Sequence, residues 1–105
     1  SVGTSPTITS TSPSNGATGV SPAKTIAVTF SEAIRKSKNF WVELVDSNGT
    51  PVAFTTYITG GNILVINPTS NLAAKTTYRV KLHTGCVTDL AGNLLAGTSF
   101  SFTTR

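Results

Sequence analysis

One short segment of this 105-residue chain carries the residues best suited to hold a metal ion. In Asp89-Leu90-Ala91-Gly92-Asn93, a carboxylate and an amide oxygen flank a glycine that allows the chain to bend. Together with loop carbonyls these are hard oxygen ligands of the kind that Ca²⁺ binds. Glu32 joins Asp89 and Asn93 if the loops at this end converge. The alternative is an Asx-type turn with no cofactor, in which Asp89 bonds backbone groups of the following residues. With so few acidic ligands, any Ca²⁺ site here is expected to be weak.

Exposed aromatic rings are a second feature with chemical use, because they form platforms on which sugars stack. Residues 40–46 alternate in polarity, and if Glu43 faces water, then Leu44 faces the core and Trp41 lies outside. Tyr57 is the other candidate for such a carbohydrate-binding platform. The alternative is a reversed register, in which Trp41 is the core tryptophan between two sheets.

The residues needed for catalysis are too few to assemble an active site. Cys86 and His83 are the single cysteine and the single histidine, and four carboxylates complete the set. A nucleophilic cysteine needs an aligned base, and a glycosidase needs two carboxyl groups across a cleft. We interpret Cys86 as a buried apolar side chain and His83 as a surface residue. The sequence therefore predicts that the chain is not an enzyme.

Charge and hydropathy narrow the range of partners. The formal net charge is +4 and the pI about 9.7, yet only 11% of residues are charged. The basic side chains are scattered, apart from Arg35, Lys36 and Lys38, whereas nucleic-acid binding needs a dense basic surface. The apolar runs are far shorter than the ~20 residues of a membrane-spanning helix. We expect no nucleic-acid partner and no direct membrane insertion.

The elements that position these residues are short strands. Apolar residues alternate with polar ones between turns rich in Gly, Pro, Asn and Ser, and no segment has helical periodicity. Residues 12–22 are expected to be an ordered loop, and residues 31–39 a loop or a single helical turn. Asn48-Gly49 favours a hairpin turn that pairs the strand before it with the strand after it. The predicted strands are residues 7–11, 24–30, 40–46, 51–58, 63–66, 98–103 and one within 72–84.

The segment 72–84 carries the most specific structural signal. Leu72 precedes Tyr78 by six residues, and from Thr76 onward the residues alternate. This spacing is typical of a tyrosine corner, in which the phenol hydroxyl bonds backbone a few residues upstream. The sequence predicts an all-β, immunoglobulin-like Greek-key β-sandwich of about seven to eight antiparallel strands.

Five segments, residues 10–20, 28–34, 72–80, 87–95 and 100–104, carry a family resemblance. Through them nearly the whole chain resembles the bacterial Ig-like domains of the SbsA/Big_5 type, which occur in S-layer proteins and adhesins. Ala33 stands where that family usually has proline, a small departure from its pattern.

This resemblance implies a fold and a context. It implies a structural module of a larger cell-surface, S-layer or secreted protein, located extracellularly and acting as a spacer or assembly unit beside neighbouring domains of the same chain. The alternative function is an adhesive or carbohydrate-binding module, such as an accessory domain of a polysaccharide-acting enzyme, with cell-wall or host glycans as partners. Residues 1–5 are expected to be a linker remnant and residues 6–105 a single domain.

Overall fold

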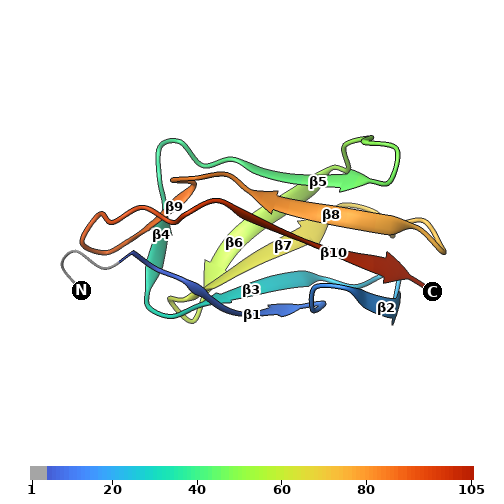
Figure 1. Cartoon of the computed structure of the whole chain (residues 1–105), viewed down its shortest axis with the longest axis horizontal. Helices are drawn as coiled ribbons and strands as arrows, with labels where there is room; N and C mark the ends of the chain where they lie inside the picture. The colour runs from blue at the N-terminus through green and yellow to red at the C-terminus, as the bar shows by residue number, and fades with distance from the viewer. Residues whose placement is uncertain (1–4) are drawn as a thin grey trace.

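The structure, a computed structural model, describes residues 5–105, and these residues form β-strands and connecting turns without a helix (Figure 1). No helix in this part of the chain could therefore span a membrane. The all-β prediction is confirmed. The ten strands are β1 (Ile8–Ser12), β2 (Ala17–Val20), β3 (Ile26–Phe30), β4 (Ile34–Lys36), β5 (Val42–Asp46), β6 (Phe54–Thr59), β7 (Ile63–Pro68), β8 (Thr77–Leu82), β9 (Val87–Asp89) and β10 (Thr98–Thr104).

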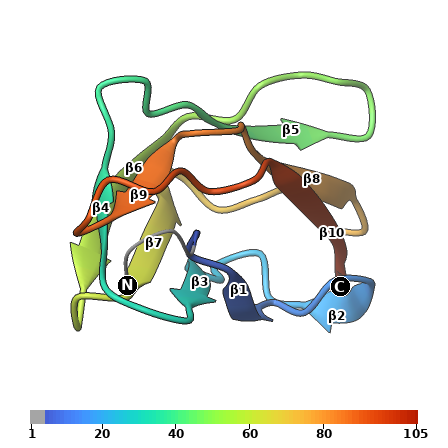
Figure 2. The same ribbon diagram turned by 60° about the vertical axis from the view of Figure 1, so that its left-hand side comes forward.

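Two four-stranded sheets face each other across one core (Figure 2). One sheet has the order β1-β3-β7-β6 and the other β2-β10-β8-β5. This arrangement matches the two layers of an immunoglobulin-like sandwich, in which the first, second, fifth and fourth of seven main strands share one sheet. When the short strands β2, β4 and β9 are left out of the count, these four are β1, β3, β7 and β6. A separate two-stranded ladder of β4 and β9 closes one end.

Three short strands lie where the sequence indicates no strand. β2 lies within the loop expected over residues 12–22, β4 lies within the segment 31–39, and β9 follows the strand β8. Each has three or four residues, too few to show alternation, and is held by a partner distant in sequence. β2 pairs with β10 in parallel, so the expectation of antiparallel strands fails at this one pair among the named strands.

The predicted hairpin around Asn48-Gly49 is wrong. Gly49 does adopt a positive φ of 80°, and the chain does turn there. However, β5 pairs with β8 and the following strand β6 pairs with β7 in the opposite sheet. The two sides of the turn meet only locally, through an isolated bridge between Val45 and Pro51 and through backbone hydrogen bonds such as that of 2.8 Å from the Val52 N–H to the Leu44 carbonyl. Asn48-Gly49 determines only the local turn. β6 joins the opposite sheet because its residues Phe54 and Ile58 pack against the core from that layer.

The core agrees with the alternation in the sequence. The inward apolar residues of β3, β8 and β10 are all buried, and β5 contributes Val42 and Leu44. Burial of this apolar surface is the main favourable contribution to folding. The predicted core residues that the structure buries are Ile26, Val28, Phe30, Leu44, Ile66, Leu72, Tyr78, Val80, Leu82, Phe100 and Phe102.

Tyr78 fixes the bend that precedes β8. Its hydroxyl accepts a hydrogen bond of 2.8 Å from the backbone N–H of Ala73. The ring is buried and packs near Phe102, with ring centroids 5.9 Å apart. Leu72 is buried beside it in the same core. This is the geometry of a tyrosine corner, in which one side chain ties a loop to the strand that follows it.

The domain is elongated, with principal extents of 43 × 21 × 19 Å. The described chain enters β1 from one end of the long axis, and β10 runs to the opposite end (Figure 1). The turn after β9 lies at the first end and the tyrosine corner at the second (Figure 1).

Candidate functional site

The Asp89 turn is built around one buried carboxylate. Oδ1 of Asp89 accepts hydrogen bonds of 2.9 Å from the backbone N–H groups of Ala91 and Asn93. Its Oδ2 accepts a 2.9 Å bond from the side-chain amide of Asn93. Gly92, with φ of 92°, completes the bend. Asp89 is fully buried, and both of its carboxylate oxygens accept hydrogen bonds within the turn.

These hydrogen bonds lower the pKa of Asp89 below its ordinary value. The side-chain amide of Asn93 is the largest cause, and the backbone N–H groups of Asn93 and Ala91 add to it against the opposing effect of burial. A carboxylate that accepts several hydrogen bonds is stabilised in its charged form. The turn therefore holds Asp89 ionised at neutral pH.

Glu32 belongs to the same end of the molecule. β4 pairs with β9 so that Ile34 lies opposite Asp89, and Glu32 precedes Ile34 in the connection from β3. Among residues 5–105, no three His, Cys, Asp or Glu side chains gather in a group able to hold a metal ion. A cation at this turn would have to compete with the hydrogen bonds that Asp89 already accepts.

The exposed side of the same turn is apolar. Leu90 and Leu94 are 61% and 54% exposed. Arg35 on β4 donates a 3.1 Å hydrogen bond from Nη2 to the carbonyl oxygen of Leu90, which ties the turn to the β4–β9 ladder. The buried carboxylate and this external bond together hold the two leucines in fixed positions.

Trp41 lies outside the core, which excludes the reversed register. It is 57% exposed, whereas Val42 and Leu44 beside it are buried. Its indole stacks on the His83 imidazole with centroids 3.6 Å apart and ring planes within 4°. Nε2 of His83 lies 2.5 Å from Oε2 of Glu43. The indole is thus held in one orientation by a stacked imidazole, which is itself fixed by a carboxylate.

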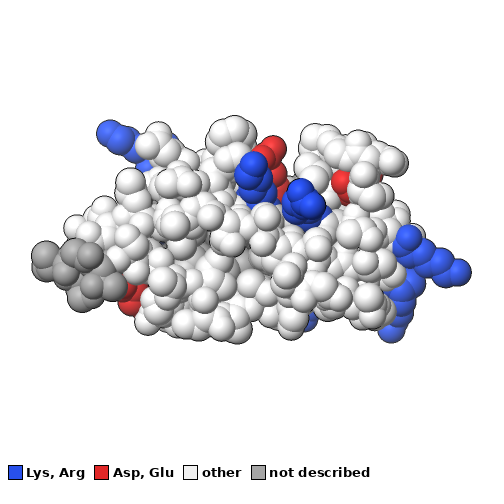
Figure 3. All heavy atoms as spheres, in the orientation of Figure 1, with Lys and Arg blue, Asp and Glu red and all other residues white. Residues whose placement is uncertain are grey.

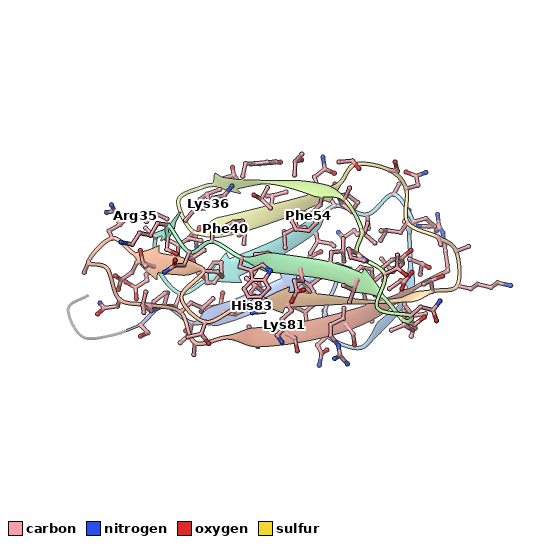
Figure 4. All side chains as sticks on the ribbon, turned by 90° about the horizontal axis from the view of Figure 1, so that it is seen from above. Arg35, Lys36, Phe40, Phe54, Lys81 and His83 are labelled. Carbon is pink, nitrogen blue, oxygen red and sulfur yellow. The ribbon has the colours of Figure 1, made fainter. Side chains whose placement is uncertain are left out.

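His83 is half-buried rather than a simple surface residue. One face of its ring is covered by Trp41, and the residue also lines a shallow groove of about 440 Å³. The other groove residues come from β8, from β10 and from the connections beside them. Figure 4 shows two of the groove residues, Lys81 and His83, near each other. The remaining lining residues are Lys81, Leu82, Thr84, Gly97, Thr98 and Ser99.

Tyr57 does not join Trp41 in one platform. Trp41 precedes β5 at an outward position of one sheet, and Tyr57, 53% exposed, is an outward residue of β6 in the other sheet. The outer faces of a two-layer sandwich point in opposite directions. The sequence left open whether Trp41 is exposed or part of the core, and it did not reveal the Trp41–His83–Glu43 cluster. The cluster could have been found only from the pairing of β5 with β8. Once these strands pair, the outward residue before β5, Trp41, and the outward residue after β8, His83, become neighbours.

Cys86 is fully buried, as the sequence indicated. Burial raises the pKa of its thiol above the ordinary value, and backbone hydrogen bonds offset part of that effect. Thiolates are the reactive form of cysteine. The side chain is therefore an inert part of the core.

Charged side chains are sparse on the face shown in Figure 3. Basic residues appear separately at both ends and beside an acidic residue near the middle, with neutral surface between them (Figure 3). Glu43 and Lys81 are cross-strand partners on β5 and β8, which places opposite charges side by side. No continuous basic stripe crosses this face.

Comparison with known proteins agrees with this two-sheet architecture, which is that of an immunoglobulin-like sandwich. The family model described as bacterial Ig-like domain, Big_5, matches residues 2–104, and the chain belongs to this family. No curated protein sequence matches the chain significantly.

Solved structures share the fold at low sequence identity. PcoC, a methionine-rich copper resistance protein from Escherichia coli, has a TM-score of 0.79 at 21% identity, with 97% of this chain and all of that chain covered. CopC from Methylosinus trichosporium OB3b has a TM-score of 0.71 at 14% identity, over 95% of this chain and 93% of that chain. Domains 1–6 of the surface layer protein SbsC give 0.70 at 17% identity, where 98% of this chain covers 14% of that chain.

Proposed function

We propose that this chain is a non-catalytic structural module of a larger cell-surface or secreted protein, where it spaces and assembles neighbouring domains outside the cytoplasm. Membership of the bacterial Ig-like family supports this assignment. The surface layer protein SbsC contains a fold of this kind as a small fraction of a long chain. A spacer needs a rigid body and two attachment points that are far apart.

The observation that carries the proposal is the shape of the domain. Its longest extent is 43 Å, about twice the other two, and the described chain enters and leaves at opposite ends (Figure 1). Modules joined through such ends extend in series rather than folding back on each other. The tyrosine corner and the buried Asp89 turn stiffen the two ends, because each ties a loop to a strand by hydrogen bonds of 2.8–2.9 Å.

Small-angle X-ray scattering on two copies joined in tandem tests the proposal. We expect the maximum dimension to exceed that of a single copy by about the 43 Å length of one module. A pair that lies side by side would lengthen far less and would contradict the spacer role. The single domain, measured at the same mass concentration, is the control for interparticle effects.

The exposed indole supports a second candidate, an adhesive or carbohydrate-binding role. Trp41 is 57% exposed and is held flat against His83. A ring fixed in advance loses little conformational entropy when a ligand stacks on it. Cell-wall or host glycans are the proposed partners, and in a polysaccharide-acting enzyme the module would be an accessory domain.

Tryptophan fluorescence separates the two candidates, because Trp41 is the single tryptophan. A glycan-binding module shows a saturable change in emission when soluble polysaccharide is added, and Trp41→Ala abolishes binding measured by calorimetry. Tyr57→Ala, on the opposite outer face, is the matched control. A spacer shows no saturable change with any wall polymer, while its tandem still extends.

Copper chemistry is not proposed for this chain, although PcoC, which shares its fold, is a copper resistance protein. Copper sites in proteins draw on Met, Cys and His ligands. This chain has no methionine, one histidine and one cysteine. Cys86 is buried, and Nε2 of His83 lies against Glu43. The residues present therefore do not fit a copper function.

A further inference from the structure

The two sheets end in four edge strands, and three of them offer little to an incoming strand. β1 is interrupted by an irregularity in its register between Ile8 and Ser10. β2 has four residues and pairs irregularly with β10. The outer edge of β5 is covered by its own chain, because the N–H of Val52 donates to the carbonyl oxygen of Leu44 at 2.8 Å. Open strand edges otherwise invite pairing with another chain.

β6 differs from these three strands. It has six residues with the sequence FTTYIT, and within the described chain it pairs only with β7. It contains no charged residue, no proline and no glycine, and its Thr, Tyr, Phe and Ile residues favour extended structure. A segment of this composition on an edge is a site for strand addition.

A single lysine covers the open edge of β6. Nζ of Lys36, from β4, donates to the carbonyl oxygen of Thr56 at 3.3 Å and to its Oγ1 at 2.6 Å. The same ammonium group lies 4.8 Å from the ring centroid of Phe40, where a cation–π interaction holds it. In Figure 4, Lys36 and Phe40 lie together beside β6.

The Lys36 contact shows which backbone groups β6 presents. Since the carbonyl of Thr56 reaches Lys36, it points away from β7. In an antiparallel ladder the N–H and C=O of one residue point to the same side, and alternate residues repeat this. The backbone groups of Phe54 and Ile58 therefore also face the open edge. Lys36 occupies the centre of this row of three residues.

We propose that Lys36 guards the β6 edge, and that the strand it excludes is β6 of a second copy of this chain. Two β6 strands can pair antiparallel about a two-fold axis with Thr56 opposite its counterpart, so that each residue meets a complementary one. Such pairing needs the Thr56 carbonyl that Lys36 holds. It would also bring two Lys36 ammonium groups to the same seam, which repel each other.

Substitution of Lys36 tests the proposal. Lys36→Met keeps an unbranched side chain that is one heavy atom shorter, and it removes both the charge and the donor. We expect sedimentation velocity to show the wild type as a monomer and K36M as a dimer, with association at a concentration at least about tenfold lower. Lys38→Met is the matched control, because Lys38 is exposed in the following loop and loses the same charge. It should stay monomeric.

A second substitution locates the contact. Thr56→Pro removes an N–H that faces the open edge, where a proline is tolerated, so K36M/T56P should return to a monomer. Amide hydrogen exchange on K36M alone gives an independent measurement, because Thr56 N–H should gain protection as the concentration rises. K36M that sediments like the wild type, or that associates without protection of Thr56, would overturn the proposal. Far-UV circular dichroism checks that each variant remains folded.

Discussion

Tyr78→Phe is the sharpest test of how the domain is held together. The substitution removes one oxygen atom and keeps the ring that packs near Phe102. That oxygen accepts a 2.8 Å hydrogen bond from the N–H of Ala73, so the bond is lost while the core volume is nearly unchanged. The effect on stability therefore reports the corner bond itself rather than a cavity.

The magnitude follows from the surroundings of the two atoms. A typical intramolecular hydrogen bond contributes about 0.5–1.5 kcal/mol net, and a buried donor left without a partner costs about 1–3 kcal/mol. The Tyr78 side chain is buried, but Ala73 is exposed, so water can reach part of the freed N–H. We expect the free energy of unfolding to fall by about 1–2 kcal/mol. With a urea m-value of about 1.5 kcal/mol/M, the midpoint falls by about 1 M.

Urea denaturation followed by circular dichroism measures this shift. Tyr57→Phe is the matched control, because the Tyr57 ring is 53% exposed on β6 and its change should stay within about 0.5 kcal/mol. An unchanged midpoint for Y78F, or equal shifts for the two variants, would refute the view that the corner hydroxyl stabilises the fold.

Three further outcomes follow from the buried groups. Cys86 should react with an aromatic disulfide reagent at least about a thousandfold more slowly in the folded chain than in the urea-unfolded chain. The reason is that the unfolded population of a small domain is about 10⁻³ or less. Equal rates would contradict the burial of Cys86. Hydrogen bonds, of which that from the Asn93 side-chain amide is the largest cause, lower the pKa of Asp89 in the folded chain. The ionised carboxylate therefore stabilises the folded state fully above about pH 4, the pKa of an unfolded aspartate. This stabilisation is lost as the pH falls through the lower pKa of Asp89 in the folded state. Asp89→Asn should remove that acid-dependent part of the unfolding free energy, measured by denaturation from pH 2 to 6. Calorimetric titration of chelator-treated protein with Ca²⁺ should be flat to several millimolar, because both Asp89 oxygens serve the turn; a saturable heat would assign a cation to it.

The alternation of apolar and polar residues predicted the core because β3, β8 and β10 each have one face buried between the two sheets. Ile26, Val28 and Phe30 of β3 are buried, and so are the inward apolar residues of β8 and β10. The spacing from Leu72 to Tyr78 likewise placed both residues beside the bend before β8. These features depend on residues within ten positions of each other, where the period of the strand and the turn chemistry decide the outcome.

Features that depend on long-range register could not be predicted in this way. The sequence offered a hairpin at Asn48-Gly49, yet β6 crosses to the other sheet because its apolar residues are needed in that layer. His83 and Glu43 are 40 residues apart and meet only because β8 pairs with β5. In the sequence Lys36 is one of three neighbouring basic residues, and its contact with Thr56 appears only when β4 is placed beside the β6 edge.

The parallel pair between β2 and β10 bears directly on a spacing role. Both strands run toward the same end of the domain, and their contact includes bonds of 2.9 Å from Arg105 N–H to the Val20 carbonyl and 2.7 Å from Gly16 N–H to the Ser101 carbonyl. Tension applied through the two ends of the described chain first loads β1 against β3, and any force passed on to β2 pulls β2 backward while β10 is pulled forward. The ladder is then loaded along the strands, so its hydrogen bonds share the force instead of opening one at a time. The N-terminal part of the described chain thus stabilises both sheets, through β1 against β3 in one and through β2 against β10 in the other.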